Sequence, residues 1–174
     1  IVPCKLGTVF RIGGTSIVVL EHCLQSIQRS LPELSQPTIE SPSLEIILIV
    51  NHEDDLNQAN MLISKHGLRG FSICDQRGFN FARKCNLGAD HAIGDILVFL
   101  NDDIDMQTKG WISHVISLLQ EDDVACVGGM LMNLDGTVQS CGDNVGRSSA
   151  VHYAPKPIPS NVGDAMHRYI ADHE

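Results

Sequence analysis

Basic residues are scarce in this chain of 174 residues, in which 12 Lys and Arg stand against 21 Asp and Glu, for a net charge of −9. That charge opposes non-specific attraction to nucleic acid phosphates and to anionic membrane surfaces, so we expect no nucleic acid partner. A negatively charged ligand would need a local positive charge, from a metal ion or from helix N-termini. The composition therefore argues against non-specific binding of polyanions, and an anionic small molecule would need a specific site.

Long apolar runs and paired cysteines are also missing. No stretch approaches the roughly 20 apolar residues that a membrane-spanning helix needs, and the first residues lack the charged-then-apolar order of a signal peptide. The six cysteines form no Cys-x-x-Cys pair, and most lie in apolar segments, where Cys behaves as a small buried hydrophobe. We therefore expect a cytoplasmic protein in a reducing compartment.

Two common ligand-binding patterns are absent as well. The eight histidines show no paired spacing such as His-x-x-x-His, which argues against a zinc site. The stretch GTVFRIGGT (7–15) has glycines at the wrong spacing for a phosphate loop, and no Lys-Ser/Thr follows Gly14. We interpret Gly13-Gly14 as a turn.

Short apolar runs alternate with helical periods along the chain. The runs at 44–50, 71–74, 95–100 and 124–132 predict strands buried on both faces. Helices are predicted between them by four sets of apolar residues at helical spacing: Leu20, Cys23, Leu24 and Ile27; Leu56, Ala59 and Ile63; Ala82, Cys85, Ala89 and Ala92; Ile112, Val115, Ile116 and Leu119. This alternation predicts an α/β fold, Rossmann-like, with a mostly parallel sheet flanked by helices.

The length predicts a single domain over residues 1–174. The Pro- and Ser-rich segment 31–43 is typical of a surface connection, and 146–163 is typical of a long loop. The chain begins on IVPC, which has the character of a strand, and stops on YIADHE without a helix stop signal. We expect a fragment of a longer protein.

The stretch DILVFLNDDIDM (95–106) runs from an apolar strand into Asn101, Asp102 and Asp103. Ligands of parallel sheets bind at the carboxyl ends of strands, and adjacent carboxylates repel each other unless a cation or proton compensates. Mg²⁺ or Mn²⁺ suits hard carboxylate oxygens and would recruit a nucleotide diphosphate. Two alternatives remain open here: the acids cap the following helix, or one of them is a phosphoacceptor.

Four motifs in order lead to this strand end: Phe79-Asn80-Phe81-Ala82, Asn86-Leu87-Gly88-Ala89, Ala92-Ile93-Gly94-Asp95 and Leu100-Asn101-Asp102-Asp103. Trp111 and VGGMLMNLDGTVQSCGD (127–143) follow. Over roughly residues 44–152 the chain resembles the nucleotide-sugar-binding half of inverting family 2 glycosyltransferases of the GT-A fold, most closely the rhamnosyltransferase-like type of polysaccharide biosynthesis. The resemblance implies transfer from a UDP- or dTDP-linked sugar to a saccharide or lipid-linked saccharide acceptor.

The resemblance also implies residue roles. Asp103 is expected to be the ligand of Mn²⁺ or Mg²⁺, with Asn101 at the first position of an Asp-x-Asp-type motif. Asp102 is expected to face the ribose or phosphates of the donor. Asn51 takes the position of an Asp that pairs with uracil or thymine, for which an amide both donates and accepts. Pro3 is expected to end the first strand and to contact the donor.

Further donor contacts are expected from the segment before the acidic strand. One of Arg77, Arg83 and Lys84 would neutralise the diphosphate, and Arg83 is our choice; the alternative is a solvated cationic face. Asn86 takes a position that supports the donor site in the family. His152 either approaches the donor phosphates or is an ordinary loop histidine.

The chain also departs from the family. The sequence HEDD (52–55) replaces the usual Gly-containing turn, and nothing after Gly163 resembles the acidic motif that supplies the general base, so the catalytic residue is unknown. We expect the acceptor-side C-terminal part to be missing. The alternative is a non-catalytic or degenerate module of the same fold that binds a nucleotide or a partner.

Peripheral membrane association would involve parts of the protein outside this chain. Asp135-Gly136 is typical of a hairpin turn.

Overall fold

The computed structural model describes residues 5–11, 17–31, 43–78, 80–141, 143–145 and 150–152. The chain divides into two compact units, Ile1–Ser117 and Leu118–Glu174. The single domain expected for residues 1–174 stays a prediction.

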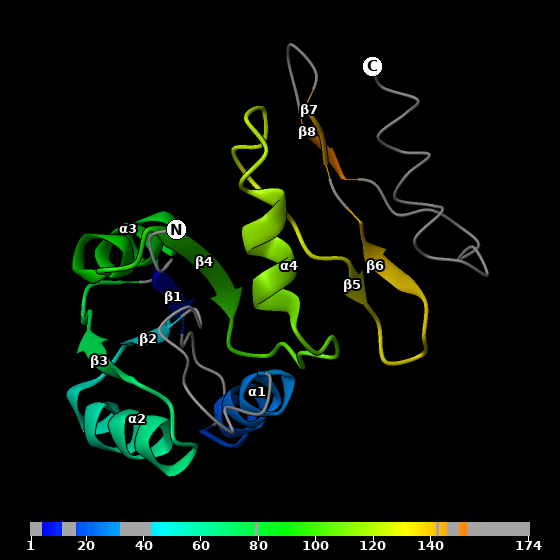
Figure 1. The fold of residues 1–174 in the computed structure, drawn as a ribbon. Helices are drawn as coiled ribbons and strands as arrows, with labels where there is room; N and C mark the ends of the chain where they lie inside the picture. Colours follow the sequence, from blue (N-terminus) through cyan, green and yellow to red (C-terminus); the bar gives the residue numbers. More distant parts are fainter. Residues whose placement is uncertain are drawn as a thin grey trace. The chain divides into compact units, whose positions relative to one another are not determined.

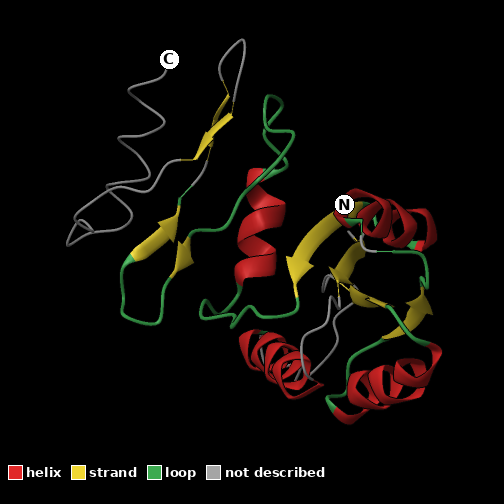
Figure 2. Cartoon of the chain, turned by 180° about the vertical axis from the view of Figure 1, so that it is seen from behind, coloured by secondary structure: helices red, strands yellow, loops and turns green. Residues whose placement is uncertain are grey.

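The first unit contains a parallel sheet and its helices (Figures 1 and 2). Its strands are β1 (Lys5–Arg11), β2 (Ser43–Val50), β3 (Gly70–Cys74) and β4 (Ile96–Asn101). Its helices are α1 (Ile17–Ser30), α2 (Glu53–Lys65), α3 (Phe81–His91) and α4 (Trp111–Leu118), of which the last residue of α4, Leu118, falls in the second unit. The strand order is β3-β2-β1-β4, and every neighbouring pair is parallel. The predicted parallel α/β sheet is confirmed.

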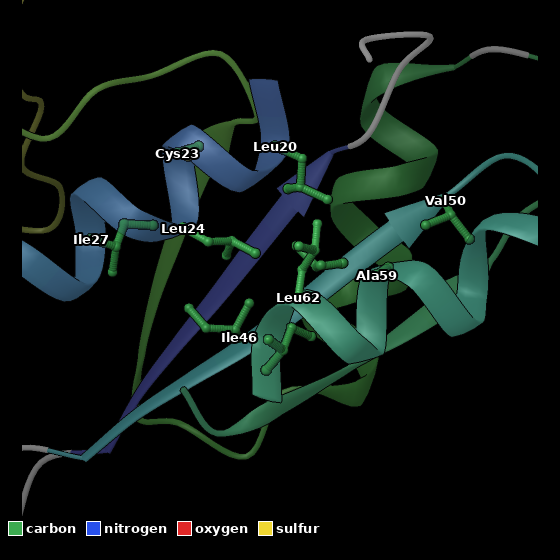
Figure 3. Close-up of a cluster of buried hydrophobic side chains, with 10 residues drawn as sticks. Leu20, Cys23, Leu24, Ile27, Ile46, Val50, Ala59 and Leu62 are labelled. Carbon is green, nitrogen blue, oxygen red and sulfur yellow. The ribbon is translucent and has the colours of Figure 1, made fainter. Parts of the chain in front are cut away.

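Strand β2 is buried on both faces. Its last five residues, Ile46–Val50, each have 0% solvent exposure. Alternate side chains of a strand point to opposite faces, so this strand joins two cores. On one face it packs against the buried residues of α1 and α2 (Figure 3), which are Leu20, Cys23, Leu24, Ile27, Ala59, Leu62 and Ile63. On the other face Ile47 and Ile49 contact Leu87 of α3 and Ala92.

Strand β1 is not predicted by the apolar pattern of the sequence. Its residues, KLGTVFR, mix polar residues and a glycine with apolar ones, whereas a buried parallel strand usually has a continuous apolar run. Pro3, which was expected to end the first strand and to contact the donor, lies outside the described residues, so both expectations stay predictions.

The second unit contains two antiparallel strand pairs. Strands β5 (Leu131–Met132) and β6 (Val138–Ser140) form one pair, and β7 (Asp143–Val145) and β8 (Ala150–His152) form the other. The strand expected at 124–132 is therefore largely wrong, because residues 124–130 have no regular structure. Two adjacent glycines, at 128 and 129, weaken the run as a strand.

The hairpin turn expected at Asp135-Gly136 is confirmed. Gly136 has a φ of 81°, and its N–H donates to the carbonyl of Asn133 over 3.0 Å. The long loop expected at 146–163 is interrupted by β8, which contains His152 and pairs it with Asp143. The expectation that His152 is a loop residue is therefore wrong.

The start of β3 has no room for a side chain. Gly70 pairs with Ile46 of β2, and a Cβ atom on Gly70 would lie 1.9 Å from the Ile46 carbonyl oxygen. We predict that Gly70→Ala destabilises the first unit by about 1–3 kcal/mol or more, because the strands must separate. Denaturant unfolding followed by circular dichroism measures this. Gly78→Ala, at a position with nothing within 4 Å, is the control, and equal stabilities of the two variants would contradict the prediction.

The α2 core contact can be tested with two neighbouring residues. Leu62 is 8% exposed and lies in the core, whereas Met61 is 71% exposed. We expect Leu62→Ala to lower the free energy of unfolding by about 2–5 kcal/mol and Met61→Ala to change it by less than about 0.5 kcal/mol. The same unfolding measurement decides, and a large loss in Met61→Ala would contradict the assigned face.

Candidate functional site

The direction in which successive strands are added to the sheet reverses between β1 and β4. The chain passes from β1 to β2 and β3 on one side, and then to β4 on the other side of β1. Open parallel sheets bind ligands at the carboxyl ends of their strands at such a reversal. Asn101, which ends β4, pairs with Arg11, which ends β1. The candidate site therefore lies where β1 and β4 end.

The same edge carries polar residues at other strand ends. Asn51 follows β2 and Asp75 follows β3. Strand β1 lies between β2 and β4, so Asn51 is about 10 Å, or two strand spacings, from the end of β4. The structure thus brings Asn51 and Asn101–Asp103 to one edge of the sheet, at a separation that an elongated ligand could span.

The acidic residues after β4 differ in exposure. Asn101 and Asp103 are exposed, whereas Asp102 is only 6% exposed. Within the described ranges, Asp102 Oδ2 is buried and has no hydrogen-bond partner. Because α4 begins only at Trp111, the alternative that these acids cap the following helix is wrong.

Helix α1 packs beneath this acidic segment. The thiol of Cys23 donates to the carbonyl of Asn101 over 3.8 Å. The pKa of Cys23 is raised to about 12, mainly by burial and to a smaller extent by the nearby carboxylates of Asp102 and Asp103, while a backbone hydrogen bond with Ile104 opposes the rise. The thiol is therefore neutral at physiological pH and adds no negative charge to this edge.

The carboxylates fit a divalent cation that a substrate helps to bind. In the described part of the chain, no group of three or more His, Cys, Asp or Glu side chains could hold a metal ion. Mg²⁺ needs only one or two protein carboxylates and takes its other ligands from water and substrate phosphates. The exposed Asp103 and the unpartnered oxygen of Asp102 suit such a site, and the role of Asp103 as metal ligand stays a prediction.

Arg83 forms a clamp on the loop after β3. Its Nε donates to Asp75 Oδ2 over 2.9 Å, and its Nη2 donates to the carbonyls of Arg77, over 3.0 Å, and Gly78. Arg77 Nε donates to Asp75 Oδ1 over 2.7 Å. Asp75, which is 3% exposed, therefore lies between two guanidinium groups. The expected donor contact of Arg83 stays a prediction, since in this structure the side chain holds the loop.

Lys84 contradicts one expectation. It is 0% exposed, so a solvated cationic face is wrong for this residue. Burial raises the pKa of the Cys74 thiol at the end of β3, and the Lys84 ammonium opposes that rise, which places Lys84 near the sheet. The apolar residues used to predict α3 did not indicate this burial, because the buried residues of the helix are Lys84 and Gly88, which are not among them.

The asparagines on and before α3 have different positions. Asn80 is the N-cap of the helix, and its Oδ1 accepts the N–H of Arg83 over 2.9 Å. Sequence reasoning missed this cap, although Asn is a favoured N-cap residue. Asn86 is exposed on α3, and its expected support of the donor site stays a prediction.

The HEDD segment forms the start of α2. His52 is the N-cap, and Glu53, Asp54 and Asp55 fill the first turn. Carboxylates are favourable there because they face the positive end of the helix dipole. Helix α2 thus begins directly after Asn51, which is half-buried, where the family was expected to have a glycine turn.

Comparison with known proteins defines the class. The model of glycosyl transferase family 2 matches residues 17–152. The chain belongs to this family, and its parallel α/β sheet confirms the expected GT-A, Rossmann-like fold class.

Two relatives match parts of the chain. O-antigen biosynthesis protein RfbC of Myxococcus xanthus is 28% identical over 147 residues, which cover 83% of this chain and 12% of that protein. Uncharacterized protein y4gI of Sinorhizobium fredii (strain NBRC 101917 / NGR234) is 33% identical over 72 residues, which cover 41% of this chain and 8% of that protein. The chain therefore spans only a small part of the length of these relatives. No helix among the described residues has the length and apolar character needed to cross a membrane.

The Asp75 clamp predicts an acid-sensitive contribution to stability. Hydrogen bonds from Arg77 and Arg83 lower the pKa of Asp75 from 3.8 to about 2. Because the pKa is lowered in the folded state, the stabilisation is complete above pH 3.8 and is lost as the pH falls towards about 2. We expect Asp75→Asn to be less stable than the wild type at neutral pH, with the difference shrinking across this window.

Thermal unfolding between pH 7 and pH 2 measures the difference. Asp90→Asn, which changes an exposed carboxylate of α3, is the matched control. A difference between Asp75→Asn and the wild type that stays constant down to pH 2 would contradict the clamp.

Proposed function

We propose that this chain is the donor-binding segment of an inverting glycosyltransferase that uses a UDP- or dTDP-linked sugar and Mn²⁺ or Mg²⁺. The acceptor is a saccharide or a lipid-linked saccharide, as in polysaccharide biosynthesis. The name of the Myxococcus xanthus relative, an O-antigen biosynthesis protein, supports this class of acceptor. Residues outside this chain complete catalysis.

The observation that carries the proposal is the pair of carboxylates where β4 ends, at the reversal between β1 and β4. An acidic edge repels a diphosphate unless a cation lies between them. Asp103 is exposed and can reach a ligand, while Asp102 has a buried oxygen without a partner in the described part of the chain. Such an edge suits a nucleoside diphosphate bound through a divalent cation, which, when present, neutralises the departing diphosphate.

The residues of the chain have separate tasks in this proposal. Asp103 holds the cation, Asp102 orients the ribose and phosphates, and Asn101 ends the strand that presents them. Asn51, two strand spacings away, pairs with the edge of the base through its amide. Inversion needs a general base that takes the proton of the acceptor hydroxyl as its oxygen attacks the sugar; none of the described carboxylates is assigned that role.

A cytoplasmic location is part of the same proposal. Three of the described cysteines, Cys23, Cys74 and Cys126, form no disulfide, which agrees with a reducing compartment. Peripheral membrane association, if the full protein has it, would involve parts outside this chain.

One observation favours a second candidate, a degenerate module that binds a nucleotide or a partner without transfer. Three carboxylates, Glu53–Asp55, form the first turn of α2 beside Asn51. These carboxylates add negative charge beside the end of β2, where the proposed function places the nucleotide base. Nucleotide binding that needs no divalent cation would favour this candidate.

The proposal is tested by calorimetric titration with UDP and dTDP, each with and without Mn²⁺. We expect one nucleotide to bind only with Mn²⁺. We expect Asp103→Ala to weaken that binding by more than about tenfold, because mutation of residues that only support a metal ligand already lowers metal affinity by about tenfold or more. The fold should persist, since Asp103 is exposed.

Asp90→Ala is the matched control, because it removes an exposed carboxylate near the end of α3, away from the carboxyl edge of the sheet. Unchanged Mn²⁺-dependent affinity in a folded Asp103→Ala chain would refute the metal assignment. No binding of either nucleotide by the folded wild-type chain would refute donor binding by this segment.

A further inference from the structure

One stripe of helix α1 contacts the segment that carries the acidic residues. Cys23, Ser26, Arg29 and Ser30 each bond to a residue between 101 and 111. Cys23, Ser26 and Ser30 are spaced three and four residues apart, and Arg29 follows Ser26 by three residues, so all four lie towards the same side of the helix. Ser26 is 0% exposed and Ser30 is 2% exposed, so the two hydroxyls lie inside the fold.

The two serines make the same pair of hydrogen bonds, one helical turn apart. Ser26 Oγ donates to the carbonyl three residues earlier over 2.8 Å and accepts the backbone N–H of Met106 over 2.8 Å. Ser30 Oγ donates to the carbonyl three residues earlier over 2.7 Å and accepts the indole N–H of Trp111 over 2.9 Å. Because each hydroxyl proton is used within the helix, each oxygen can only accept from the acidic segment.

Two further bonds accompany them. The carbonyl of Ser30 accepts the N–H of Gly110 over 3.0 Å. Arg29 Nη2 lies 3.2 Å from Asp105 Oδ1, but both side chains are about half exposed, so this ion pair contributes little. The buried serine contacts therefore carry the attachment.

The segment depends on contacts of this kind for its conformation. Described residues 102–110 form turns and irregular chain, with neither helix nor strand. A ladder of backbone hydrogen bonds therefore does not fix the two carboxylates, which precede Met106 by only a few residues. Helix α1, whose bonded residues are 76 to 81 positions away in sequence, supplies fixed acceptors.

We propose that Ser26 and Ser30 of α1 are positioning residues, which hold the acidic segment in the conformation that binds the divalent cation and the donor diphosphate. This proposal rests on the proposed function. The serines touch neither ligand; they act through the backbone of Met106 and the indole of Trp111.

The test titrates Mn²⁺ into the full chain with saturating UDP or dTDP, whichever the wild type binds. We expect Ser26→Ala to raise the half-saturating Mn²⁺ concentration about five- to tenfold, because a partly buried N–H loses its acceptor. The carboxylates are intact, so higher Mn²⁺ should restore full binding. Ser64→Ala, an exposed serine on α2, is the matched control and should match the wild type.

The single tryptophan of the chain gives a second readout that needs no ligand. Trp111 bonds to Ser30, so Ser30→Ala should increase acrylamide quenching of its fluorescence and should also raise the half-saturating Mn²⁺ concentration. If Ser26→Ala does not fold, Ser26→Cys keeps the size of the side chain with a weaker acceptor and should shift the Mn²⁺ titration in the same direction.

The outcomes separate the two proposals. A folded Ser26→Ala chain that is thermally less stable but has wild-type Mn²⁺ half-saturation would overturn the positioning role and leave the proposed function standing. A wild-type chain without Mn²⁺-dependent binding would overturn the proposed function, and the positioning role with it. A raised Mn²⁺ requirement in both serine variants, with Ser64→Ala unchanged, supports the positioning role.

Discussion

Burial of β2 on both faces is the constraint on which the first unit depends. Five consecutive apolar side chains must leave water on two sides at once, so a helical layer is needed on each face. Helices α1 and α2 cover one face, and α3 covers the other. Once α1 is packed by Leu24 and its neighbours, its serines face the acidic segment. Once α3 is packed by Leu87, its first turn brings Arg83 to Asp75. The polar edge is thus built by helices that the apolar core orients.

Much of this architecture could be predicted from the sequence. Strands β2, β3 and β4 are mostly apolar, and α1 and α2 have clear helical periods, so local composition is enough to find them. Strand β1 could not be found in that way, because its mixed sequence becomes a central strand only through two parallel neighbours. The run at 124–130 shows the opposite error, since an apolar run becomes a strand only where it has a partner to pair with.

The candidate site was predictable in position and less so in detail. The acidic motif after an apolar strand is visible in the sequence, and the structure shows that Asp103 in this motif is exposed. The burial of Asp102 is not visible, because it depends on how the folded chain packs around the residue and not on the local sequence. Arg83 and Lys84 are adjacent cations with opposite environments: one clamps Asp75 and the other is buried. Sequence could not separate them, because helix rotation relative to the sheet decides which of two neighbours is covered.

The packing of Cys23 against Asn101 has a consequence for oxidation. Thiol oxidation proceeds through the thiolate and needs access to solvent. Cys23 is 1% exposed, and its pKa is raised to about 12. Its thiol is therefore neither ionised nor accessible to peroxide and disulfide reagents. The exposed Cys126 is the more accessible target. Oxidation would therefore modify Cys126 before Cys23, and the contact between Cys23 and Asn101 would outlast the first oxidation of the chain.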